Sequence, residues 1–423
     1  MKKSLLFLFS FSSVWLLAGC GGATSGPPPP LKAITITFGS GRALDGSDAI
    51  NAPNQTFNVW VVNADGSGTT PLTKLTANNA DSFGPVRSTD GTKIAFNSSR
   101  ALDGSDAANS NVTFNIWVMN ADGSGAIPVT KLTASGAYSF VSAWSPDDSK
   151  IAFSSSRALD GSDLNGGTEN IWVVNPDGSG ATPLTKLIAS SFAPAWSPDG
   201  SKIAFNSGRA LDGSNALNAN DNPNIWVMNA DGSGATPVTK LTVIGTNPIF
   251  MAWSPNGSKI AFSSSRALDG SDALNGPNDT ENIWVVNPDG SGATPITKFT
   301  ASGADSFAPV WSPGGSKIAF GTTRALDGSD AANANRTSNI WVMNADGSGA
   351  TSLTKLTAVQ PLNIVPGIWL PDGSKIVFDS ARALDGTDAA NSNGTRNIWI
   401  MNADGSSAAP LTKLTASGTD SLL

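Results

Sequence analysis

Residues 196–205 read Trp196-Ser-Pro-Asp-Gly-Ser-Lys-Ile-Ala-Phe205, and residues 225–228 read Ile225-Trp-Val-Met228. Both apolar runs are short and rich in β-branched and aromatic residues, which favours strands over helices. Ser-Pro-Asp-Gly places proline where a turn needs φ near −65° and glycine where φ is positive. The turn sequence Asn229-Ala-Asp-Gly-Ser-Gly234 then leads into Pro237-Val-Thr-Lys-Leu-Thr242. The unit is therefore predicted to be a four-stranded antiparallel meander.

This unit is repeated along the chain. Arg-Ala-Leu-Asp-Gly recurs seven times at spacings of 52 to 58 residues, and each copy precedes a tryptophan strand. The tryptophans are Trp60, Trp117, Trp172, Trp226, Trp284, Trp341 and Trp399. A fixed period of this length indicates one supersecondary unit that is copied and stacked. Because the meander is apolar on both faces, radial stacking would bury both, which predicts an all-β, seven-bladed β-propeller over residues 33–423. A linear stack is the alternative.

The repeat resembles a known family. Trp-Ser-Pro-Asp-Gly-Ser-Lys-Ile-Ala-Phe, followed by Ile-Trp-Val-Met-Asn-x-Asp-Gly and Leu-Thr, is similar to the TolB-type (WD-like) propeller repeat. The resemblance covers nearly all of the chain after residue 33. It departs from the pattern at Arg87, which stands where later copies have an inner-strand tryptophan, and no α/β domain of the kind that precedes the TolB propeller is expected. The resemblance implies the propeller fold and a role as a protein-interaction scaffold.

The ends of the repeat array predict how the ring closes. The first copy begins at a second strand, near residues 34–38, so the inner strand of that blade is expected from the C-terminal tail. Asp420-Ser-Leu422 matches Asp305-Ser-Phe307, the start of an inner strand. Only Leu422 and Leu423 are available to form it. Either this blade is three-stranded, or the sequence is truncated.

The N-terminus has the pattern of an export signal and a lipid anchor. A short basic start precedes an apolar run over residues 5–17 that is too short to span a bilayer comfortably. Leu17-Ala-Gly-Cys20 resembles the bacterial lipobox, which implies removal of residues 1–19 and lipidation of Cys20. An ordinary signal peptide followed by an incidental cysteine is the alternative. Residues 20–32 then form a Gly/Pro tether.

The anchor predicts where the protein acts. Gly21 follows the cysteine where an inner-membrane lipoprotein would often carry aspartate, so an outer-membrane location in a bacterial envelope is favoured. The sequence leaves open whether the propeller faces the periplasm or the outside. Membrane association is expected from the lipid alone.

Composition excludes several function classes. The net charge of −7 gives no basic footprint for nucleic acid or anionic lipid. The chain has no histidine, which excludes Ser-His-Asp triads, imidazole zinc sites and propeller lyases with a His-bound metal. Glu169 and Glu281 are the only glutamates, and they occupy the same repeat position two blades apart. Paired-carboxylate hydrolysis needs acids within roughly 5–10 Å, so a carboxylate-based hydrolase or lyase, which aspartate pairs would have to support, is the least favoured function.

A long polar loop lies between the second and third strands of each copy. Its alternating Asp and Asn side chains are the hard oxygen ligands that Ca²⁺ prefers, although the spacing is not that of an EF-hand. The candidate ligands are Asp103, Asp106, Asn109, Asn111, Asp160, Asp163, Asp269, Asp272, Asp327 and Asp330. One copy carries Asn215 in place of the second aspartate, which would weaken a cation site there. The alternative is that these residues cap their own backbone in Asx turns.

The same loops are expected to form a crown on one face of the propeller. The arginines that open them are candidates for a partner-binding face: Arg42, Arg100, Arg157, Arg209, Arg266, Arg324 and Arg382. We therefore expect a non-enzymatic scaffold that binds an envelope protein. A polysaccharide-binding or Ca²⁺-binding surface module is the alternative, although Phe57 and Phe114 are the only aromatics at the ends of the loops.

Overall fold

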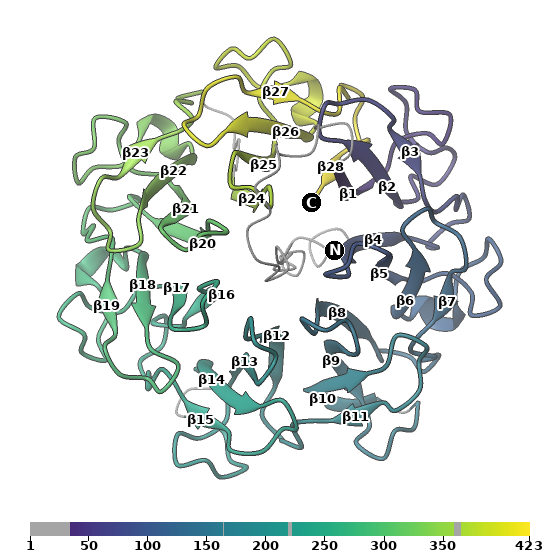
Figure 1. Ribbon diagram of the computed structural model, residues 1–423, viewed down its shortest axis with the longest axis horizontal. Helices are drawn as coiled ribbons and strands as arrows, with labels where there is room; N and C mark the ends of the chain where they lie inside the picture. The colour runs from purple at the N-terminus through teal and green to yellow at the C-terminus, as the bar shows by residue number, and fades with distance from the viewer. Residues whose placement is uncertain (1–33, 164, 219–221, 359–364) are drawn as a thin grey trace, which may run out of the picture.

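Seven sheets surround a common centre in the computed structural model, which describes residues 34–163, 165–218, 222–358 and 365–423 (Figure 1). Each sheet has four antiparallel strands, which confirms the predicted all-β, seven-bladed propeller. No helix in these ranges is both long enough and apolar enough to cross a bilayer. The predicted signal peptide, Cys20 and the tether lie outside the described residues.

The strands are numbered along the chain, and blade 1 combines the last strand with the first three. From the innermost strand outward, the blades are: blade 1, β28 (Ser421–Leu422), β1 (Thr35–Ser40), β2 (Asn58–Asn63) and β3 (Thr70–Pro71); blade 2, β4 (Ser82–Arg87), β5 (Lys93–Ser98), β6 (Asn115–Asn120) and β7 (Ile127–Pro128); blade 3, β8 (Ser139–Trp144), β9 (Ile151–Arg157), β10 (Asn165–Val174) and β11 (Thr182–Pro183); blade 4, β12 (Ser191–Trp196), β13 (Lys202–Ser207), β14 (Asn224–Asn229) and β15 (Thr236–Pro237).

The remaining blades follow the same order. They are: blade 5, β16 (Ile249–Trp253), β17 (Ile260–Ser264), β18 (Asn282–Val286) and β19 (Thr294–Pro295); blade 6, β20 (Ser306–Trp311), β21 (Lys317–Thr322), β22 (Asn339–Asn344) and β23 (Thr351–Ser352); blade 7, β24 (Val365–Trp369), β25 (Lys375–Ser380), β26 (Asn397–Asn402) and β27 (Ala409–Pro410). Among the described residues, short 3₁₀ turns interrupt four of the long loops: η2 (Ser110–Val112), η4 (Gly276–Asn278), η5 (Ala334–Arg336) and η6 (Ser392–Gly394).

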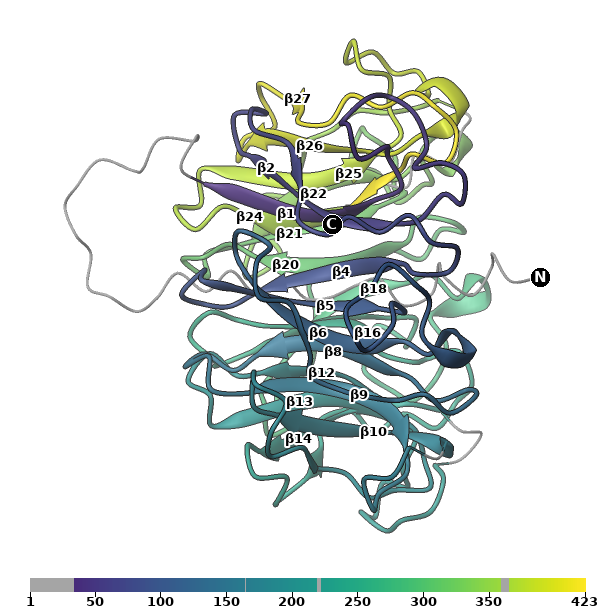
Figure 2. The same cartoon turned by 90° about the vertical axis from the view of Figure 1, so that its right-hand side faces the viewer.

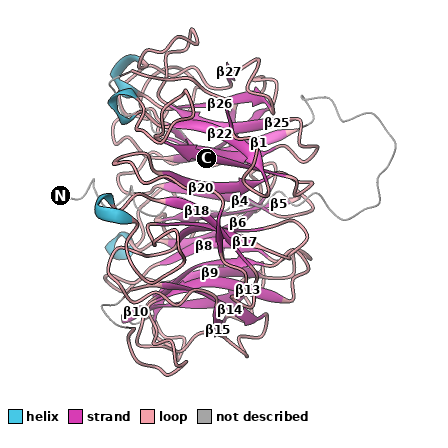
Figure 3. Ribbon diagram, turned by 90° about the vertical axis from the view of Figure 1, so that its left-hand side faces the viewer, coloured by secondary structure: helices cyan, strands magenta, loops and turns pink. Residues whose placement is uncertain are grey.

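The two faces of the disc differ in their loops. Seen edge-on, the strands of successive blades run from one face to the other (Figure 2). The long loops, with their short 3₁₀ turns, gather on one face, which we call the crown face (Figure 3). The links that leave the fourth strand of each blade lie on the same face, because an antiparallel meander returns there after its third turn. The tight Pro-Asp-Gly and Asp-Gly-Ser turns form the opposite face.

The ring closes between the two ends of the propeller. β28 pairs antiparallel with β1, with Leu422 opposite Gly39 and Ser421 opposite Ser40. The Ser40 hydroxyl donates to the Thr419 carbonyl at 2.9 Å, and the Gly41 amide donates to the Asp420 carbonyl at 3.3 Å. Blade 1 therefore has four strands, and the expectation that the C-terminal tail supplies its inner strand is confirmed. The three-stranded alternative is wrong, since two residues suffice to form the pairing.

The core lies between the blades. Ile171 and Val173 of blade 3 belong to one apolar cluster with Phe205 and Trp226 of blade 4. A corresponding cluster lies at each of the other blade boundaries. The third-strand tryptophans are at most 3% exposed. Full burial of such a side chain stabilises the fold by about 2–3 kcal/mol. The sheets are thus covered on both faces, as the apolar Ile-Trp-Val-Met strands predicted.

Inner-strand tryptophans link neighbouring blades at four boundaries of the described structure, whereas the buried indole N–H of Trp196 has no hydrogen-bond partner. The Trp144 indole N–H donates to the Val86 carbonyl of the preceding blade at 2.9 Å, and Trp253 donates to Ala195 at 3.1 Å. In blade 2 the arginine that replaces this tryptophan donates instead to the Gly91 carbonyl of its own turn at 3.0 Å. Arg87, in place of tryptophan, therefore makes no such hydrogen bond to the preceding blade.

Candidate functional site

The predicted partner-face arginines are held inside their own loops. Each guanidinium lies over the third-strand tryptophan of its blade, with carbon-to-ring-centre distances from 4.5 Å for Arg324 to 5.1 Å for Arg42. Each also donates to the carbonyl of the glycine four residues ahead. Burial lowers the pKa of Arg42, and the charges of Asp48 and Asp45 partly offset that effect. These arginines fix the loop conformation, and a role in partner binding stays a prediction.

The first aspartate of each loop caps its own turn. Asp103 accepts from the Ser105 amide at 2.9 Å, and Asp160 accepts from Ser162 at 2.8 Å. Asp269 and Asp327 make the same contact with Ser271 and Ser329 at 2.8 Å. This is the Asx turn that the sequence offered as the alternative to a cation site.

The second aspartate of each loop joins neighbouring blades. Asp106 of blade 2 accepts from the Thr76 amide at 2.9 Å, the Thr76 hydroxyl at 2.6 Å and the Ala77 amide at 2.9 Å, all in the link that leaves blade 1. We call this arrangement the Asp–Thr clasp. The other clasps are Asp163–Thr133, Asp272–Thr242, Asp330–Thr300, Asp388–Thr357 and Asp48–Thr415. Burial raises the pKa of Asp106, but these hydrogen bonds outweigh it and the net shift is downward.

One clasp has changed at both partners. Between blades 3 and 4, Asn215 accepts from the Ile188 amide at 2.7 Å. Ile188 has no hydroxyl to donate, and Asn215 has one acceptor oxygen where aspartate has two. Asn215, which was predicted above to weaken a cation site, is therefore accompanied by a change of its hydrogen-bond partner across the blade boundary, from threonine to Ile188.

The loop asparagines use their amide groups in the same network. Asn109 donates to the Leu132 carbonyl at 2.7 Å and accepts from the Ser110 amide at 2.9 Å, while Asn111 donates to the Thr133 carbonyl at 2.9 Å. Within the described ranges, no group of three or more acidic, histidine or cysteine side chains is placed to hold a metal. Each candidate calcium ligand named above therefore makes a hydrogen bond within the protein. The calcium site stays a prediction.

The copies also differ at three further positions on the crown face, which the predictions from the sequence did not include. We call these positions the crown ring: the residue six before the inner-strand tryptophan or its equivalent, the residue after the second-strand phenylalanine, and the residue three before the third-strand tryptophan. The last of these is occupied by Phe57, Phe114, Glu169, Pro223, Glu281, Ser338 and Arg396. Comparing the seven copies column by column would have found it.

Aromatic side chains cluster at and beside the crown ring of blades 2 and 3. The ring centres of Phe83 and Phe114 are 5.3 Å apart, and Phe114 and Phe140 are 5.8 Å apart. Tyr138 lies 5.1 Å from Phe140. All four side chains are partly exposed. The inner strands therefore bring aromatics to the crown face that the loop sequences alone did not reveal.

Glu169 lies beside this cluster in blade 3. Its side chain is 8% exposed, and it receives hydrogen bonds from the Ser154 and Tyr138 hydroxyls. Burial raises the pKa of Glu169, and the two hydrogen bonds partly oppose that rise. Burial and the neighbouring glutamate raise the pKa of Tyr138 to about 12. The blade 3 carboxylate thus has two hydroxyl donors beside it.

Glu281 occupies the same position in blade 5 with different neighbours. Burial raises its pKa to about 7, a hydrogen bond from Ser263 opposes the rise, and the charge of Asp305 adds to it. The Glu281 amide donates to the Asp305 carboxylate at 3.0 Å, which places an acid of blade 6 next to it. The Oε1 atom of Glu281 is buried and has no hydrogen-bond partner. The sequence placed the two glutamates in separate blades correctly, but it did not find Asp305.

Blade 7 carries an ion pair at the crown ring. The Arg396 guanidinium lies 3.3 Å from the Asp379 carboxylate. Burial raises the pKa of Asp379 to about 6, although the charge of Arg396 pulls it down. The Arg396 amide also donates to Asp420 at 2.8 Å. This register position thus carries aromatic, acidic, basic or small residues in different blades.

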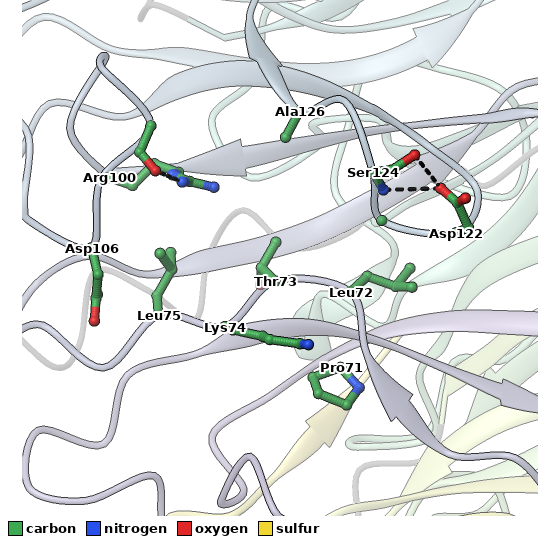
Figure 4. Close-up of a pocket in the computed structure, with 12 residues that line it drawn as sticks. Pro71, Leu72, Thr73, Lys74, Leu75, Arg100, Asp106, Asp122, Ser124 and Ala126 are labelled. Atoms are coloured by element: carbon green, nitrogen blue, oxygen red, sulfur yellow. Dashed lines mark hydrogen bonds between the residues drawn. The ribbon is translucent and has the colours of Figure 1, made fainter.

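Open grooves also lie between blades on the outer rim. One of about 500 Å³ between blades 1 and 2 has Arg100 and Asp106 at one end and Asp122 with Ser124 at the other, with Leu72 and Leu75 between them (Figure 4). An equivalent groove of about 440 Å³ lies between blades 5 and 6. These grooves are formed by residue types common to the repeats, so they do not distinguish one blade pair from another.

Comparison with known proteins gives the fold relatives of this chain. No protein-family model matches it. A curated relative, the uncharacterized peptidase YuxL of Bacillus subtilis (strain 168), is 29% identical over 117 residues, which are 28% of this chain and 16% of the peptidase. The chain therefore spans a small part of that protein's length.

Three similar solved structures extend over more of the chain. Oligogalacturonate lyase from Vibrio parahaemolyticus has a TM-score of 0.52 at 17% identity and covers 91% of this chain and 88% of its own. A puromycin-hydrolyzing peptidase of Mycobacterium tuberculosis has a TM-score of 0.53 at 12% identity, covering 86% and 51%. A TolB from Agrobacterium tumefaciens has a TM-score of 0.44 at 18% identity, covering 79% and 94%. Proteins of the TolB type, peptidases and a lyase are thus among the structures that this chain resembles, and at these identities the likeness extends to the fold alone.

Proposed function

We propose that this protein is a non-catalytic envelope lipoprotein whose propeller binds a protein partner through its crown ring. The observation that supports this proposal is the place at which the amino-acid sequences of the seven copies differ. The loop arginines and aspartates are nearly invariant among the copies and contact their own blade or its neighbour, whereas the crown ring changes from blade to blade. A specific partner needs such an asymmetric surface, because identical copies would present the same contact seven times.

Exposed apolar side chains also support partner binding through the crown face. Ile188 is 61% exposed, Leu217 51% and Ile244 67%, all on the crown face of blades 3 to 5. Large apolar side chains that gather on one surface are typical of protein interaction sites. In other copies the position of Ile244 carries Asn78 or Ser135, so the apolar character is particular to these blades.

The test is partner capture with a matched control. Wild-type protein and the Ile188→Asp/Ile244→Asp variant are cross-linked in intact envelopes, and captured proteins are identified by mass spectrometry. The double variant is expected to lose the captured protein about tenfold or more, because it places charge in an apolar contact. Ile127→Asp is the control, since Ile127 is 41% exposed and lies at β7 away from the crown loops. Equal capture by all three proteins would contradict the crown-face proposal.

Lipid anchoring at Cys20 is part of this proposal. Cys20→Ser should release the protein from the membrane fraction into the soluble envelope fraction, because a serine cannot take the thioether-linked lipid. Fractionation followed by immunoblotting measures this. Persistent membrane association of the variant would argue against the lipoprotein assignment.

Carboxylate catalysis is the second candidate. Glu281, with its pKa of about 7, has Asp305 as a neighbouring acid, and the similar structures include a lyase and peptidases. A group that titrates near neutrality suits general acid or base work. A hydrolysis screen with oligosaccharides and peptides tests it, using Glu281→Gln as the inactive reference. Turnover that this variant abolishes would replace the scaffold proposal.

Calcium binding is tested separately. A ligand that binds the native state raises its stability, so a calcium site would raise the melting temperature between chelator and millimolar Ca²⁺. The Asx turns and clasps already engage the loop carboxylates, so we expect no shift. A rise that Asp103→Asn removes would establish the calcium module instead.

A further inference from the structure

The innermost strand of blade 1 covers only part of the strand beside it. β1 has six residues, but β28, which lies on its inner side (Figure 1), pairs with only two of them. The Ala64 amide donates to the Ile34 carbonyl at 2.8 Å, so alternate residues of β1 from Ile34 onward turn their backbone groups to β2. Thr35 and Thr37 therefore turn theirs to the inner side, where no described strand pairs with them.

The side chains at this edge also show the opening. In the other six blades the residue that matches Thr37 is 0% exposed: Ala95, Ala152, Ala204, Ala261, Ala319 and Val377. Thr37 itself is partly exposed. On the other face of the strand, Ile36 and Phe38 are buried in one cluster with Leu370 of blade 7. The opening is thus limited to the backbone edge of β1 and the face that carries Thr37.

Blade 2 lies against that face with a charged residue. At five boundaries the alanine that matches Thr37 packs in one cluster with the inner-strand tryptophan of the next blade, as Ala204 does with Trp253. β1 lies against β4, and the residues at the corresponding positions here are Thr37 and Arg87. A polar pair therefore replaces an apolar pair at the boundary where the inner strand is short.

Arg87 has no carboxylate within ion-pair distance among the described residues. Its Nη1 atom donates to the Gly91 carbonyl at 3.0 Å, and its Nε atom is buried without a hydrogen-bond partner. Burial lowers the pKa of Arg87, and no aspartate offsets that effect as Asp48 and Asp45 do for Arg42. A carboxylate placed beside Arg87 would therefore supply the opposite charge that this half-buried guanidinium lacks.

The repeat indicates which residue of an added strand would meet Arg87. Trp253 donates to the Ala195 carbonyl of the preceding blade, and Ala195 pairs with Ala204. Arg87 stands at the position of Trp253, and Thr37 stands at that of Ala204. The residue that an added strand places opposite Thr37 therefore faces Arg87.

We propose that the open inner edge of β1 binds an extended segment of a protein, which continues β28 and places an acidic side chain opposite Thr37 against Arg87. An uncovered edge is a template for strand pairing, in which backbone hydrogen bonds give affinity and side-chain pairs give selectivity. The open part of the edge lies toward the tight-turn face, because the second half of each inner strand leads into a tight turn. This site is therefore separate from the crown-face contact proposed above.

Hydrogen exchange tests whether the edge is open. The Thr37 amide of the mature protein is expected to exchange about tenfold or more faster than the Ala204 amide, because Ala204 has an inner strand beside it. Equal protection of the two amides would show that the edge is already paired and would overturn the proposal. Protection of Thr37 that rises with protein concentration would overturn it in favour of a second copy of this chain.

Two peptides test the chemistry of the bound segment. Acetyl-Thr-Val-Glu-Ala-Thr-amide and its glutamine counterpart are compared by ligand-observed NMR and by exchange of the Thr37 amide. The glutamate peptide is expected to slow that exchange and to bind about tenfold more tightly, the scale of a charge-assisted hydrogen bond. Arg87→Gln should remove this preference, whereas Arg336→Gln, at an exposed arginine of the crown face, should preserve it. Binding of neither peptide, or equal binding of both to the wild-type protein, would refute the proposal.

An extension of the chain tests the place of binding. Pro-Glu-Ala added after Leu423 continues β28 as residues 194–196 continue the start of β12, and it puts glutamate opposite Thr37. This protein is expected to protect the Thr37 amide and to lose peptide binding. The matched Pro-Lys-Ala extension, which brings a second cation to Arg87, is expected to do neither. Unchanged peptide binding by the folded Pro-Glu-Ala protein would place the peptide elsewhere and overturn the proposal.

The crown-face variant separates this inference from the proposed function. Ile188→Asp/Ile244→Asp is expected to lose the captured partner but to bind the glutamate peptide as the wild-type protein does. Loss of peptide binding in that variant would refute a separate site at β1. Loss of partner capture in Arg87→Gln, with the crown face intact, would show that the captured partner also uses this edge and would support it.

Discussion

Single residues in the crown ring show how equivalent strands of different blades come to hold side chains of different charge and pKa. Glu281 is separated from solvent and has Asp305 beside it. Ser263 lies within hydrogen-bond reach of its side chain, but that hydroxyl also donates to the Ile249 carbonyl at 3.3 Å. At blade 7 the same register position holds Arg396, which instead pairs with the buried Asp379. The backbone around both residues is the same, so the difference arises from the side chains that surround them.

Glu281 is expected to make stability fall as pH rises. Its pKa is raised from 4.5 to about 7, so the folded state holds a proton that the unfolded state releases between these values. The destabilisation that comes from ionising the buried Glu281 is absent below pH 4.5 and complete above pH 7, with an upper limit of about 3 kcal/mol. Glu281→Gln should therefore stabilise the protein at pH 8 and change little at pH 4.5. Urea unfolding at both pH values measures this, with the exposed Asp122→Asn as control. An equal effect of Glu281→Gln at both pH values would show that the side chain is not buried as a neutral acid.

Elements are joined across blade boundaries by the Asp–Thr clasp. The clasp connects the loop before a third strand to the link after the preceding fourth strand, as in Asp163 with Thr133. It therefore fixes the two most irregular segments of the crown face against each other. The boundary between blades 3 and 4 keeps only the bond from Ile188 to Asn215.

Restoring the missing clasp should stabilise that boundary. Ile188→Thr with Asn215→Asp recreates the pair found at the other boundaries, and a hydrogen bond to a charged group contributes about 1.5–3 kcal/mol. Neither single change supplies both the hydroxyl donor and the carboxylate acceptor, so the gain is expected to be non-additive. Thermal unfolding of the two single variants and the double variant forms the cycle. Additive effects would show that the two substitutions are independent.

The whole molecule depends on closing a ring between distant parts of the chain. Asp48 and Thr415 form the clasp between blades 7 and 1, and β28 pairs with β1 at the same boundary. Every other boundary joins neighbours in sequence. Loss of a contact here allows blade 1 to separate, whereas loss elsewhere leaves the neighbours connected by the chain.

Asp48→Ala should therefore be more damaging than the same change in another blade. Both Asp48→Ala and Asp106→Ala remove one clasp, but only the former weakens the closure. We expect a lower midpoint of denaturation and faster proteolysis of blade 1 in Asp48→Ala. Limited proteolysis with mass-spectrometric mapping of the cleavage sites distinguishes the two variants. Identical cleavage patterns would mean that the β28–β1 pairing alone holds the ring.

Much of the architecture was predictable because it is local and repeated. The Pro-Asp-Gly turns, the apolar Ile-Trp-Val-Met strands and the fixed period each specify one meander, and seven copies specify the propeller. Arg87 and Asn215 were recognised as departures, but their consequences were not. Arg87 loses a bond to the preceding blade, and Asn215 is matched by Ile188, which lies 27 residues away. Such pairings follow from the radial arrangement and not from neighbours in sequence.

The sequence alone determined the strands, the turns, the blade number and the absence of histidine chemistry, since each depends on residue type and on spacing within one unit. Only the tertiary structure decided what those residues face. It shows that the loop aspartates cap turns and form clasps, it places Asp305 beside Glu281, and it leaves acceptor oxygens of Asn206, Asn247 and Glu281 without hydrogen-bond partners. The physical reason is that burial and hydrogen bonding at the crown ring depend on three strands and two blades together.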